Sequence, residues 1–366
     1  DTAEPREQNL CLLDCDLDQS GSNRGDDEAN TGGQEKPKKE AVDRSRVNAF
    51  IGHIFSRFAP PVKLTYSQWA ESNVILPDYS AEPGPYRIER VPYMQEPMDC
   101  LCDPSVRTAV WLFAARTTKS QGLLNILGYH IDQDPAPILM IRPTVDDAQD
   151  FSKERIAPIL EDVPVLAAKI SEPKSRESSN TILHKKFPGG YIVMVGANAP
   201  RGLRSWDSRI ILCDEVDGFP ASAGNEGDPI ALATIRATTF WNSKVVISST
   251  PTVKGESRIE TAYENSTQEQ WCVACPSCGE FQPYEWQRLL FPQSSLDAYK
   301  PGHAVDEARP LEPEMSCAHC GVFHTEWEWK SQPAKWIARR KHDSCRGFHL
   351  NAMASLFLSW QDLVDE

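Results

Sequence analysis

The chain has 366 residues, 25% of them charged and 40% hydrophobic, and 38 basic against 52 acidic residues give a formal net charge of −14. This length allows one large or two smaller domains with a sizeable core. No apolar run approaches the roughly eighteen residues of a membrane-spanning helix, and no basic-then-apolar leader opens the sequence, so we expect no membrane partner and no secretory signal. The acidic balance argues against wholesale coating of nucleic acid.

The beginning of the chain, residues 1–45, is acidic, rich in Gly, Ser, Asn and Gln, and nearly free of aromatic residues. Such a segment buries too little apolar surface to offset its ordering entropy, so we expect a disordered acidic tail there. The first residue is Asp1 rather than Met, which suggests a fragment or an incomplete gene model. An extended stretch is expected over 77–86, where three prolines forbid a helix. Short helices are predicted over 47–58, 67–72 and 92–101.

Short apolar runs then alternate with helical patterns up to about residue 270. Continuous β-branched runs of this length are typical of strands buried on both faces of a parallel sheet. The alternation predicts an α/β domain over residues 46–270, a three-layer fold with helices on both faces of a parallel sheet. The predicted strands are 108–113, 138–141, 191–195, 209–213 and 244–248, and the predicted helices between them include 120–131 and 145–160.

The first predicted strand leads through a polar loop into Lys119, Ser120 and a helix. This is the layout of a P-loop, in which backbone N–H groups hold phosphates, Lys119 reaches the β- and γ-phosphates and Ser120 ligates Mg²⁺. Thr118 and Phe113 replace the usual glycines, and since a β-branched residue resists positive φ, we expect the loop to curve differently or to bind more weakly. Taken alone, the turn is better explained as a helix N-terminus that carries Lys and Ser by chance.

Another predicted strand ends in two adjacent carboxylates, Asp214 and Glu215. Ligands of open α/β sheets bind at the carboxyl ends of the strands. At that edge Asp214 is expected to hold Mg²⁺ through water and Glu215 to polarise an attacking water, while Asp217 is a weaker candidate that caps the next turn. A solvated acidic turn is the common alternative, but this pair follows the Lys-Ser turn by about the right number of βα units.

The strand after the acidic pair ends in hydroxyl-bearing residues, Ser249 and Thr250, followed by Pro251 and Thr252. Beside the acidic strand, such residues are placed to sense a γ-phosphate and to pass the signal onward. Without the two preceding motifs this segment is an ordinary turn.

Two Cys-x-x-Cys-Gly turns lie in the last third of the chain. Each places two thiolates on one side of a tight turn, and two such turns supply a tetrahedral zinc site with no open position for catalysis. Without a secretion signal, eleven cysteines indicate metal ligands and buried thiols rather than disulfides. We predict a small zinc-ribbon-like subdomain over residues 271–348, with an inserted loop over 287–313 and Cys272 as a competing ligand. The predicted ligands are Cys275, Cys278, Cys317 and Cys320.

Together these motifs resemble the large subunit of the lambda-type phage DNA-packaging terminases, the GpA family, over roughly residues 59–366. The resemblance implies an ASCE-type, RecA-like ATPase that drives double-stranded viral DNA into a preformed capsid. In full-length family members a metal-dependent endonuclease domain follows. The stretches that carry the resemblance are 69–72, 80–86, 103–106, 143–144, 203–205, 212–217, 249–258 and the two cysteine turns.

The resemblance also implies roles for single residues, together with ATP, Mg²⁺ and structural Zn²⁺ as cofactors. Its implied partners are double-stranded DNA, a small terminase subunit, the portal or procapsid and further copies of the chain, and its implied location is the host cytoplasm. The implied ATP-binding residues are Arg116, Thr117, Thr118, Lys119 and Ser120; Asp214 and Glu215 match the Walker B acid and the catalytic Glu; Ser249, Thr250 and Pro251 match the coupling motif; and Cys275, Cys278, Cys317 and Cys320 match the family's cysteine pairs.

Residues 349–366 are expected to be a linker toward an absent nuclease domain, so this chain is not expected to cut DNA unaided. Ten bases against six acids give residues 151–210 a net charge of +4, a candidate DNA contact or equally a solvated mixed-charge face. Two alternative functions stay open. One is a degenerate prophage remnant that binds DNA or partner subunits without ATP turnover, and the other is a helicase-like ATPase, since Asp-Glu-x-Asp is shared with that group.

Overall fold

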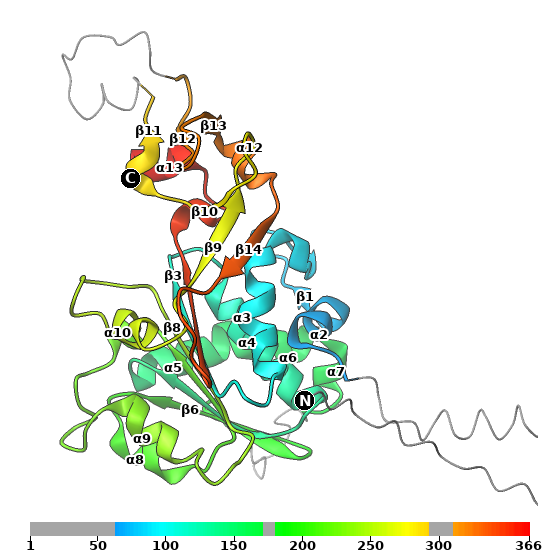
Figure 1. Ribbon diagram of the computed structural model, residues 1–366. Coiled ribbons are helices and arrows are strands. Elements are labelled where there is room, and N and C mark those ends of the chain that lie inside the picture. Colours follow the sequence, from blue (N-terminus) through cyan, green and yellow to red (C-terminus); the bar gives the residue numbers. More distant parts are fainter. Residues whose placement is uncertain (1–62, 171–179, 293–309) are drawn as a thin grey trace, which may run out of the picture. The chain divides into compact units, whose positions relative to one another are not determined.

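The computed structural model describes residues 63–170, 180–292 and 310–366 (Figure 1). The acidic tail expected over 1–45 and the helix expected over 47–58 lie outside the described residues. The central element is a ten-stranded mixed sheet, in which nine strands follow the order β10-β9-β15-β3-β8-β7-β4-β6-β5 and β14 pairs with β9. At one edge, β5 (His184–Phe187) pairs antiparallel with β6. Among the helices of the described part, none is both long and apolar enough to span a membrane.

Seven neighbouring strands of this sheet run parallel. All five strands predicted from the sequence are among them, and each is almost entirely buried, because a parallel strand covered by helices on both faces meets no solvent. The seven are β9 (Glu269–Ala274), β15 (Cys345–Leu350), β3 (Thr108–Phe113), β8 (Lys244–Ser249), β7 (Ile210–Asp214), β4 (Pro137–Arg142) and β6 (Gly190–Gly196).

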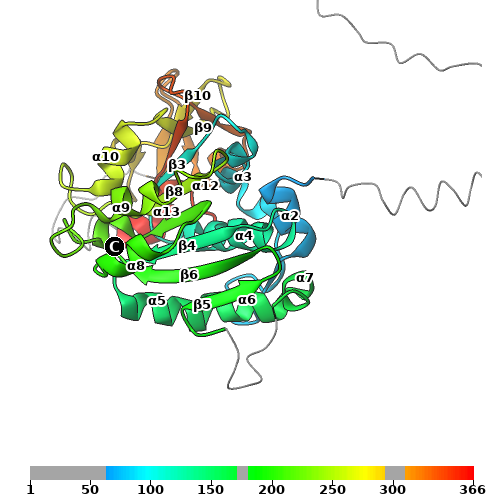
Figure 2. The same cartoon turned by 90° about the horizontal axis from the view of Figure 1, so that it is seen from below.

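Alternate residues of these strands enter two separate hydrophobic cores, so the α/β layering expected from the sequence is confirmed. In β3, Trp111 and Phe113 face one core, and Val110 and Leu112 face the other. Figure 2 shows the helices on either side of the sheet. The first core is covered by α2 (Tyr66–Asn73), α3 (Gln95–Asp99), α4 (Lys119–Asp132), α5 (Val145–Phe151), the π-helical turn η4 (Ser152–Ile156), α6 (Ala157–Asp162) and α7 (Pro164–Ala167); the second by α8 (Pro200–Ser205), α9 (Pro229–Ile235) and α10 (Arg258–Glu264).

The cysteine-rich part of the chain is continuous with the central sheet. Its first strand, β9, pairs with β15 and then β10 along one side and with β14 along the other, so the expected boundary at residue 270 falls inside a strand. The remaining elements of this part are β10 (Phe281–Pro283), β14 (Ala334–Ile337), the helix α12 (Glu326–Lys330), and a three-stranded sheet of β11 (Leu289–Leu290), β12 (Glu314–Ser316) and β13 (Phe323–Thr325).

Residues 349–366, expected to be a linker, are instead part of the fold. His349 and Leu350 end β15, which pairs in register with β3 along its whole length. A 3₁₀ turn, η7 (Ala352–Ala354), and the helix α13 (Trp360–Asp365) follow, and the Trp360 side chain is fully buried. The run 345–350 has no β-branched residue and finds its partner more than 200 residues away, so no local pattern indicated this strand.

Candidate functional site

The loop between β3 and α4, residues 114–118, lies at the carboxyl edge of the sheet. Arg116 and Thr118 both take left-handed backbone conformations, with φ of 56° and 62°. Thr118 thus adopts the positive φ that its β-branched side chain disfavours, so the loop does not avoid this conformation. Each such torsion costs an L-residue about 1–2 kcal/mol. Contacts around the loop therefore hold it, among them the Thr117 hydroxyl, which donates to the Ala114 carbonyl oxygen at 2.6 Å.

The backbone at Thr118 is strained, because its φ of 62° is unfavourable for a β-branched residue. We expect Thr118→Gly to raise the free energy of unfolding by about 0.5–1 kcal/mol, because relief of the left-handed strain exceeds the entropy that glycine adds to the unfolded chain. Denaturant titration measures the change. Thr234→Gly is the matched control on the exposed face of α9, where glycine should lower stability by about 0.5–1 kcal/mol. A destabilised Thr118→Gly variant would show that the threonine side chain stabilises the loop.

Lys119 opens α4 and is only 6% exposed. Its Nζ donates to the carbonyl oxygens of Phe113 (3.1 Å) and Ala114 (2.8 Å) and to Thr250 Oγ1 (2.7 Å). Burial lowers the pKa of Lys119, while the nearby carboxylates Glu215 and Asp214 raise it. The ammonium thus lies inside the curve of the loop, where all three of its hydrogen bonds go to neutral oxygen atoms. An anionic ligand can replace these acceptors, because a hydrogen bond to a charged acceptor is stronger.

β8 lies between β3 and β7, so three of the predicted motifs end at neighbouring strands. Asp214 ends β7 and is fully buried; its Oδ2 accepts a hydrogen bond from Arg142 Nη1 at the end of β4. Burial raises the pKa of Asp214 and Arg142 lowers it. Its Oδ1 is buried without a hydrogen-bond partner in the described part of the chain. Such an oxygen is suited to accept a hydrogen bond from a metal-bound water.

Glu215 and the residues after β8 complete this edge. Glu215 takes φ of 57°, which turns the chain out of the strand. Asp217 links the neighbouring loops through hydrogen bonds. Its carboxylate accepts from the N–H groups of Thr252 and Ile259, both at 2.9 Å. Its own N–H donates to Ser249 Oγ at 3.2 Å. The Asp217 carboxylate thus acts at the start of α10, 42 residues further along the chain, rather than at the next turn, and its hydrogen bonds are structural.

A cavity of about 600 Å³ opens beside these residues. The segment 115–121, Glu215 and Thr250 line one side of it. Three groups for which we predicted no role in a nucleotide site line the rest: Leu76 with most of residues 80–91, Arg155 of η4, and Phe357 after η7. Arg142 was also missed, although it stands at the carboxyl end of an apolar strand just as Asp214 does. The other missed residues carry no local signal, because the fold alone brings them to the cavity.

The four predicted zinc ligands, Cys275, Cys278, Cys317 and Cys320, lie together, with their sulfur atoms all within 4.8 Å of one another. Cys275 Sγ is 3.8 Å from Cys320 Sγ, and Cys278 Sγ is 3.7 Å from Cys317 Sγ. Cys272, the expected competitor, lies on β9 outside this group.

The two cysteine turns have matching geometry. Gly279 and Gly321 take φ of 76° and 75°, and their N–H groups donate to the carbonyl oxygens of Cys275 and Cys317. Within the turns, the N–H groups of Ser277 and His319 donate to Cys275 Sγ at 3.4 Å and to Cys317 Sγ at 3.3 Å. Burial raises the pKa of Cys317, but backbone N–H donors outweigh it and lower that pKa to about 6. Neighbouring thiols raise the pKa of Cys278 and Cys320, so it is at Cys317 that the lowered pKa favours the thiolate, the form that binds metals.

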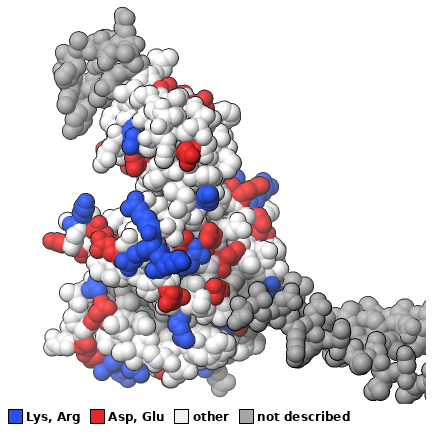
Figure 3. Space-filling view, viewed as in Figure 1, with Lys and Arg blue, Asp and Glu red and all other residues white. Residues whose placement is uncertain are grey.

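The basic stretch 151–210 carries less free positive charge than its sequence suggests. Four of its ten bases pair with carboxylates: Lys153 with Asp150, Lys169 with Asp132, Arg204 with Glu226 and Arg209 with Asp134. Residues 171–179, with two more bases, lie outside the described residues. On the face drawn in Figure 3, basic side chains gather near the middle and acidic ones lie around them.

Comparison with known proteins shows which family the sequence matches. Residues 80–336 match the family model described as phage terminase large subunit gpA, ATPase domain. The terminase large subunit of Enterobacteria phage P21 is 28% identical over 325 residues, 83% of this chain and 49% of that protein. The terminase large subunit of Escherichia phage lambda is 30% identical over 241 residues, 65% of this chain and 37% of that protein. The chain thus spans at most half the length of these curated relatives.

Among solved structures, the HK97 bacteriophage large terminase is similar with a TM-score of 0.44 and 13% identity over 55% of this chain and 41% of that chain. The ATPase domain of the Thermus phage P74-26 large terminase has a TM-score of 0.35 and 12% identity over 67% of this chain and 76% of that chain. These scores are low, so the description of the fold depends on the strand pairing above.

Proposed function

Since the chain belongs to the gpA family of phage terminase large subunits, we propose that its α/β part is the ATP-hydrolysing motor that moves double-stranded viral DNA into the procapsid. One observation carries this proposal: Lys119, Thr250 and Glu215 line one cavity at the ends of three neighbouring strands, and the buried carboxylate of Asp214 acts on Lys119 from directly before Glu215. The strand β8, inserted between the loop strand β3 and the acidic strand β7, supports the ASCE class of P-loop ATPases.

In this proposal, the triphosphate of ATP occupies the curve of the loop 114–118. The Lys119 ammonium leaves its carbonyl partners for the β- and γ-phosphates, because a charge-assisted hydrogen bond is stronger than a neutral one. The Ser120 hydroxyl and the free Oδ1 of Asp214 hold Mg²⁺, the latter through water. Bound Mg²⁺ neutralises charge on the β- and γ-phosphates.

Glu215 is the proposed catalytic carboxylate. It lines the cavity next to the phosphate-binding loop, where its oxygen accepts a hydrogen bond from a water and orients that water in line with the γ-phosphate. Thr250 contacts Lys119 directly, and Ser249 bonds the chain after Glu215, so a change at the γ-phosphate reaches β8 and α10 through hydrogen bonds already present. This is the proposed coupling role of Ser249, Thr250 and Pro251.

Lys119→Ala tests the nucleotide site most directly. We expect at least about a 100-fold loss of kcat/KM for Mg²⁺-dependent ATP hydrolysis, because a preorganised cation that stabilises transition-state charge is removed. The control is Lys153→Ala, which truncates an exposed lysine of η4. Undiminished turnover in a folded Lys119→Ala protein would contradict the assignment. A folded wild-type protein that neither binds nor hydrolyses ATP would favour the degenerate remnant instead.

We also propose structural Zn²⁺ at the four cysteines. A tetrahedral zinc with Zn–S bonds of about 2.3 Å places its sulfur atoms about 3.8 Å apart. The separations of 3.8 Å between Cys275 Sγ and Cys320 Sγ and of 3.7 Å between Cys278 Sγ and Cys317 Sγ fit that tetrahedron. Four thiolates leave no open coordination position, so the site stabilises the fold and takes no part in hydrolysis.

The proposed partners follow from the packaging role: double-stranded DNA, a small terminase subunit, the portal or procapsid, and further copies of this chain in the host cytoplasm. DNA contact by a motor needs sequence-independent phosphate contacts that release and reform. Within residues 151–210, four of the described bases form no ion pair with a described carboxylate, and they are the proposed source of these contacts: Arg155, Lys185, Lys186 and Arg201.

A further inference from the structure

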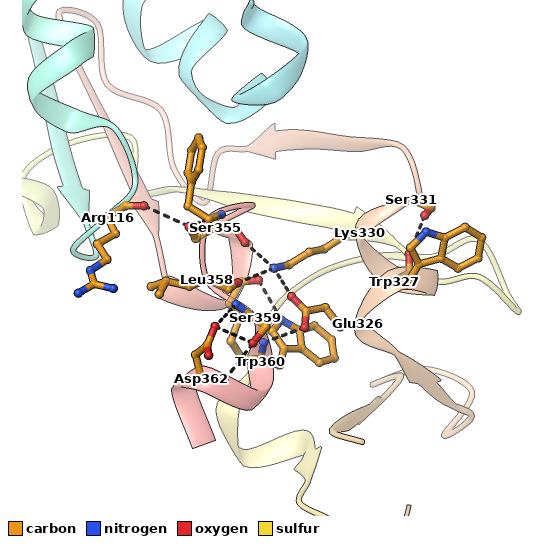
Figure 4. Close-up of polar contacts among 12 residues, drawn as sticks. Arg116, Glu326, Trp327, Lys330, Ser331, Ser355, Leu358, Ser359, Trp360 and Asp362 are labelled. Atoms are coloured by element: carbon orange, nitrogen blue, oxygen red, sulfur yellow. Dashed lines mark hydrogen bonds and ion pairs between the residues drawn. The ribbon is translucent and has the colours of Figure 1, made fainter. Parts of the chain in front are cut away.

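The chain after β15 turns back against the phosphate-binding loop, and we call its residues 351–360 the return segment. At the end of β15, the Ala114 N–H donates to the carbonyl oxygen of Leu350 at 2.9 Å. Five residues later, Ser355 Oγ donates to the carbonyl oxygen of Arg116 at 3.1 Å (Figure 4). Ser355 is fully buried, and its Oγ also accepts from the Phe357 N–H at 3.2 Å. The return segment thus contacts the loop at a left-handed residue.

Lys330 of α12 holds the return segment from the other side. Its Nζ donates to the carbonyl oxygens of Ser355 and Leu358, the second at 3.1 Å, and pairs with the Glu326 carboxylate. An ammonium has three donors, and these three acceptors use all of them. The other Glu326 oxygen accepts from the Trp360 N–H at 2.7 Å (Figure 4). Burial lowers the pKa of Lys330, and the hydrogen bond to Glu326 raises it.

The helix α12 belongs to the cysteine-rich part of the chain. It begins directly after β13, the strand that follows the second cysteine turn, and a capping box between Thr325 and Glu328 defines its start. A continuous path of bonds therefore runs from the cysteine turn through α12 and the return segment to Arg116 in the loop.

Because the peptide between Arg116 and Thr117 is planar, the hydrogen bond to the Arg116 carbonyl also sets the direction of the Thr117 N–H. In a trans peptide the carbonyl and the following N–H point in opposite directions. When the Arg116 carbonyl oxygen is held by Ser355, the Thr117 N–H points away from the return segment. Thr117 lines the cavity, where a backbone N–H is the group that binds phosphate.

We propose that Ser355 is a positioning residue for ATP binding, which holds the Arg116–Thr117 peptide in its phosphate-binding orientation, and that the Lys330–Glu326 pair holds Ser355 in place. The proposal rests on the proposed function above, because it concerns how the same loop binds the triphosphate. Ser355 touches only the backbone of the loop, and no catalytic step is assigned to it.

The first test needs no nucleotide. Hydrogen exchange of the zinc-loaded full chain should show the amide of Thr117 exchanging about five- to tenfold faster in Ser355→Ala than in wild type, since one buried hydrogen bond that orders the loop is lost. The matched control is Ser331→Ala, at the exposed residue directly after α12, whose Oγ also donates to a backbone carbonyl, that of Trp327 (Figure 4). Unchanged exchange at Thr117 in Ser355→Ala overturns the proposal.

The second test separates binding from chemistry. Ser355→Ala should raise KM for ATP about five- to tenfold and leave kcat within about twofold, because the loop is still able to reach its binding orientation but populates it less. A fall in kcat at unchanged KM overturns the positioning role. If Ser355→Ala does not fold, the pair Glu326→Gln with Lys330→Met, which keeps volume and removes both charges, should move Thr117 exchange and KM in the same direction. Failure of wild type to bind ATP would refute the proposed function alone, since the exchange result still tests Ser355.

Discussion

Glu215→Gln is expected to lower kcat for ATP hydrolysis by about 10³-fold while ATP binding is retained. The substitution keeps the shape of the side chain and removes the carboxylate that orients the attacking water. Glu215 sits at the carboxyl end of β7 in a left-handed conformation, beside the cavity and close enough to Lys119 to raise the pKa of that lysine. Steady-state ATP hydrolysis with and without linear double-stranded DNA, together with equilibrium nucleotide binding, measures both expectations.

The control for Glu215→Gln is Glu256→Gln, the same change at an exposed glutamate in the turn before α10. It should hydrolyse ATP at the wild-type rate. Turnover within about tenfold of wild type in Glu215→Gln would remove the catalytic role from this residue. Loss of both binding and turnover would place its role in ligand binding.

Metal removal is expected to have the second large effect. Stripping the four-cysteine site with a chelator should lower the apparent melting temperature by about 10 °C or more, because assembly of a structural zinc site supplies folding free energy. The loss should spread beyond the cysteine turns: Cys275 follows β9 directly, and β9 pairs with β15 in the central sheet. Differential scanning calorimetry on loaded and stripped protein, with zinc stoichiometry from elemental analysis, gives the result.

Two serine substitutions distinguish the ligands from the competing thiol. Cys317→Ser should lose zinc and melt early, whereas Cys272→Ser, on β9 outside the sulfur cluster, should keep one zinc per chain and close to wild-type stability. A stripped protein with an unchanged melting temperature would contradict a structural metal, and a zinc-free Cys272→Ser variant would move the site onto that residue.

Several elements of this protein were determined by local sequence. The apolar runs that became β3, β4, β6, β7 and β8 are long enough, and sufficiently β-branched, to indicate buried parallel strands without knowledge of their partners. Residues that follow such strands must lie at one edge of the sheet, and this rule alone placed Lys119, Asp214 and Thr250 near one another. The cysteine spacing likewise predicted two tight turns, since four thiols in two Cys-x-x-Cys-Gly turns are a local feature.

Only the tertiary structure decided the features that depend on distant residues. The strand β15 shows no apolar alternation strong enough to indicate it, and its place beside β3 turned an expected linker into part of the central sheet. Arg142 pairs with Asp214 because strand order makes β4 and β7 neighbours. The left-handed Arg116 and Thr118 are conformations that local preference disfavours. Contacts from far along the chain hold these conformations, such as the hydrogen bond from Ser355 Oγ to the Arg116 carbonyl oxygen. Sequence patterns miss such conformations because local conformational propensity is weaker than the sum of these tertiary contacts.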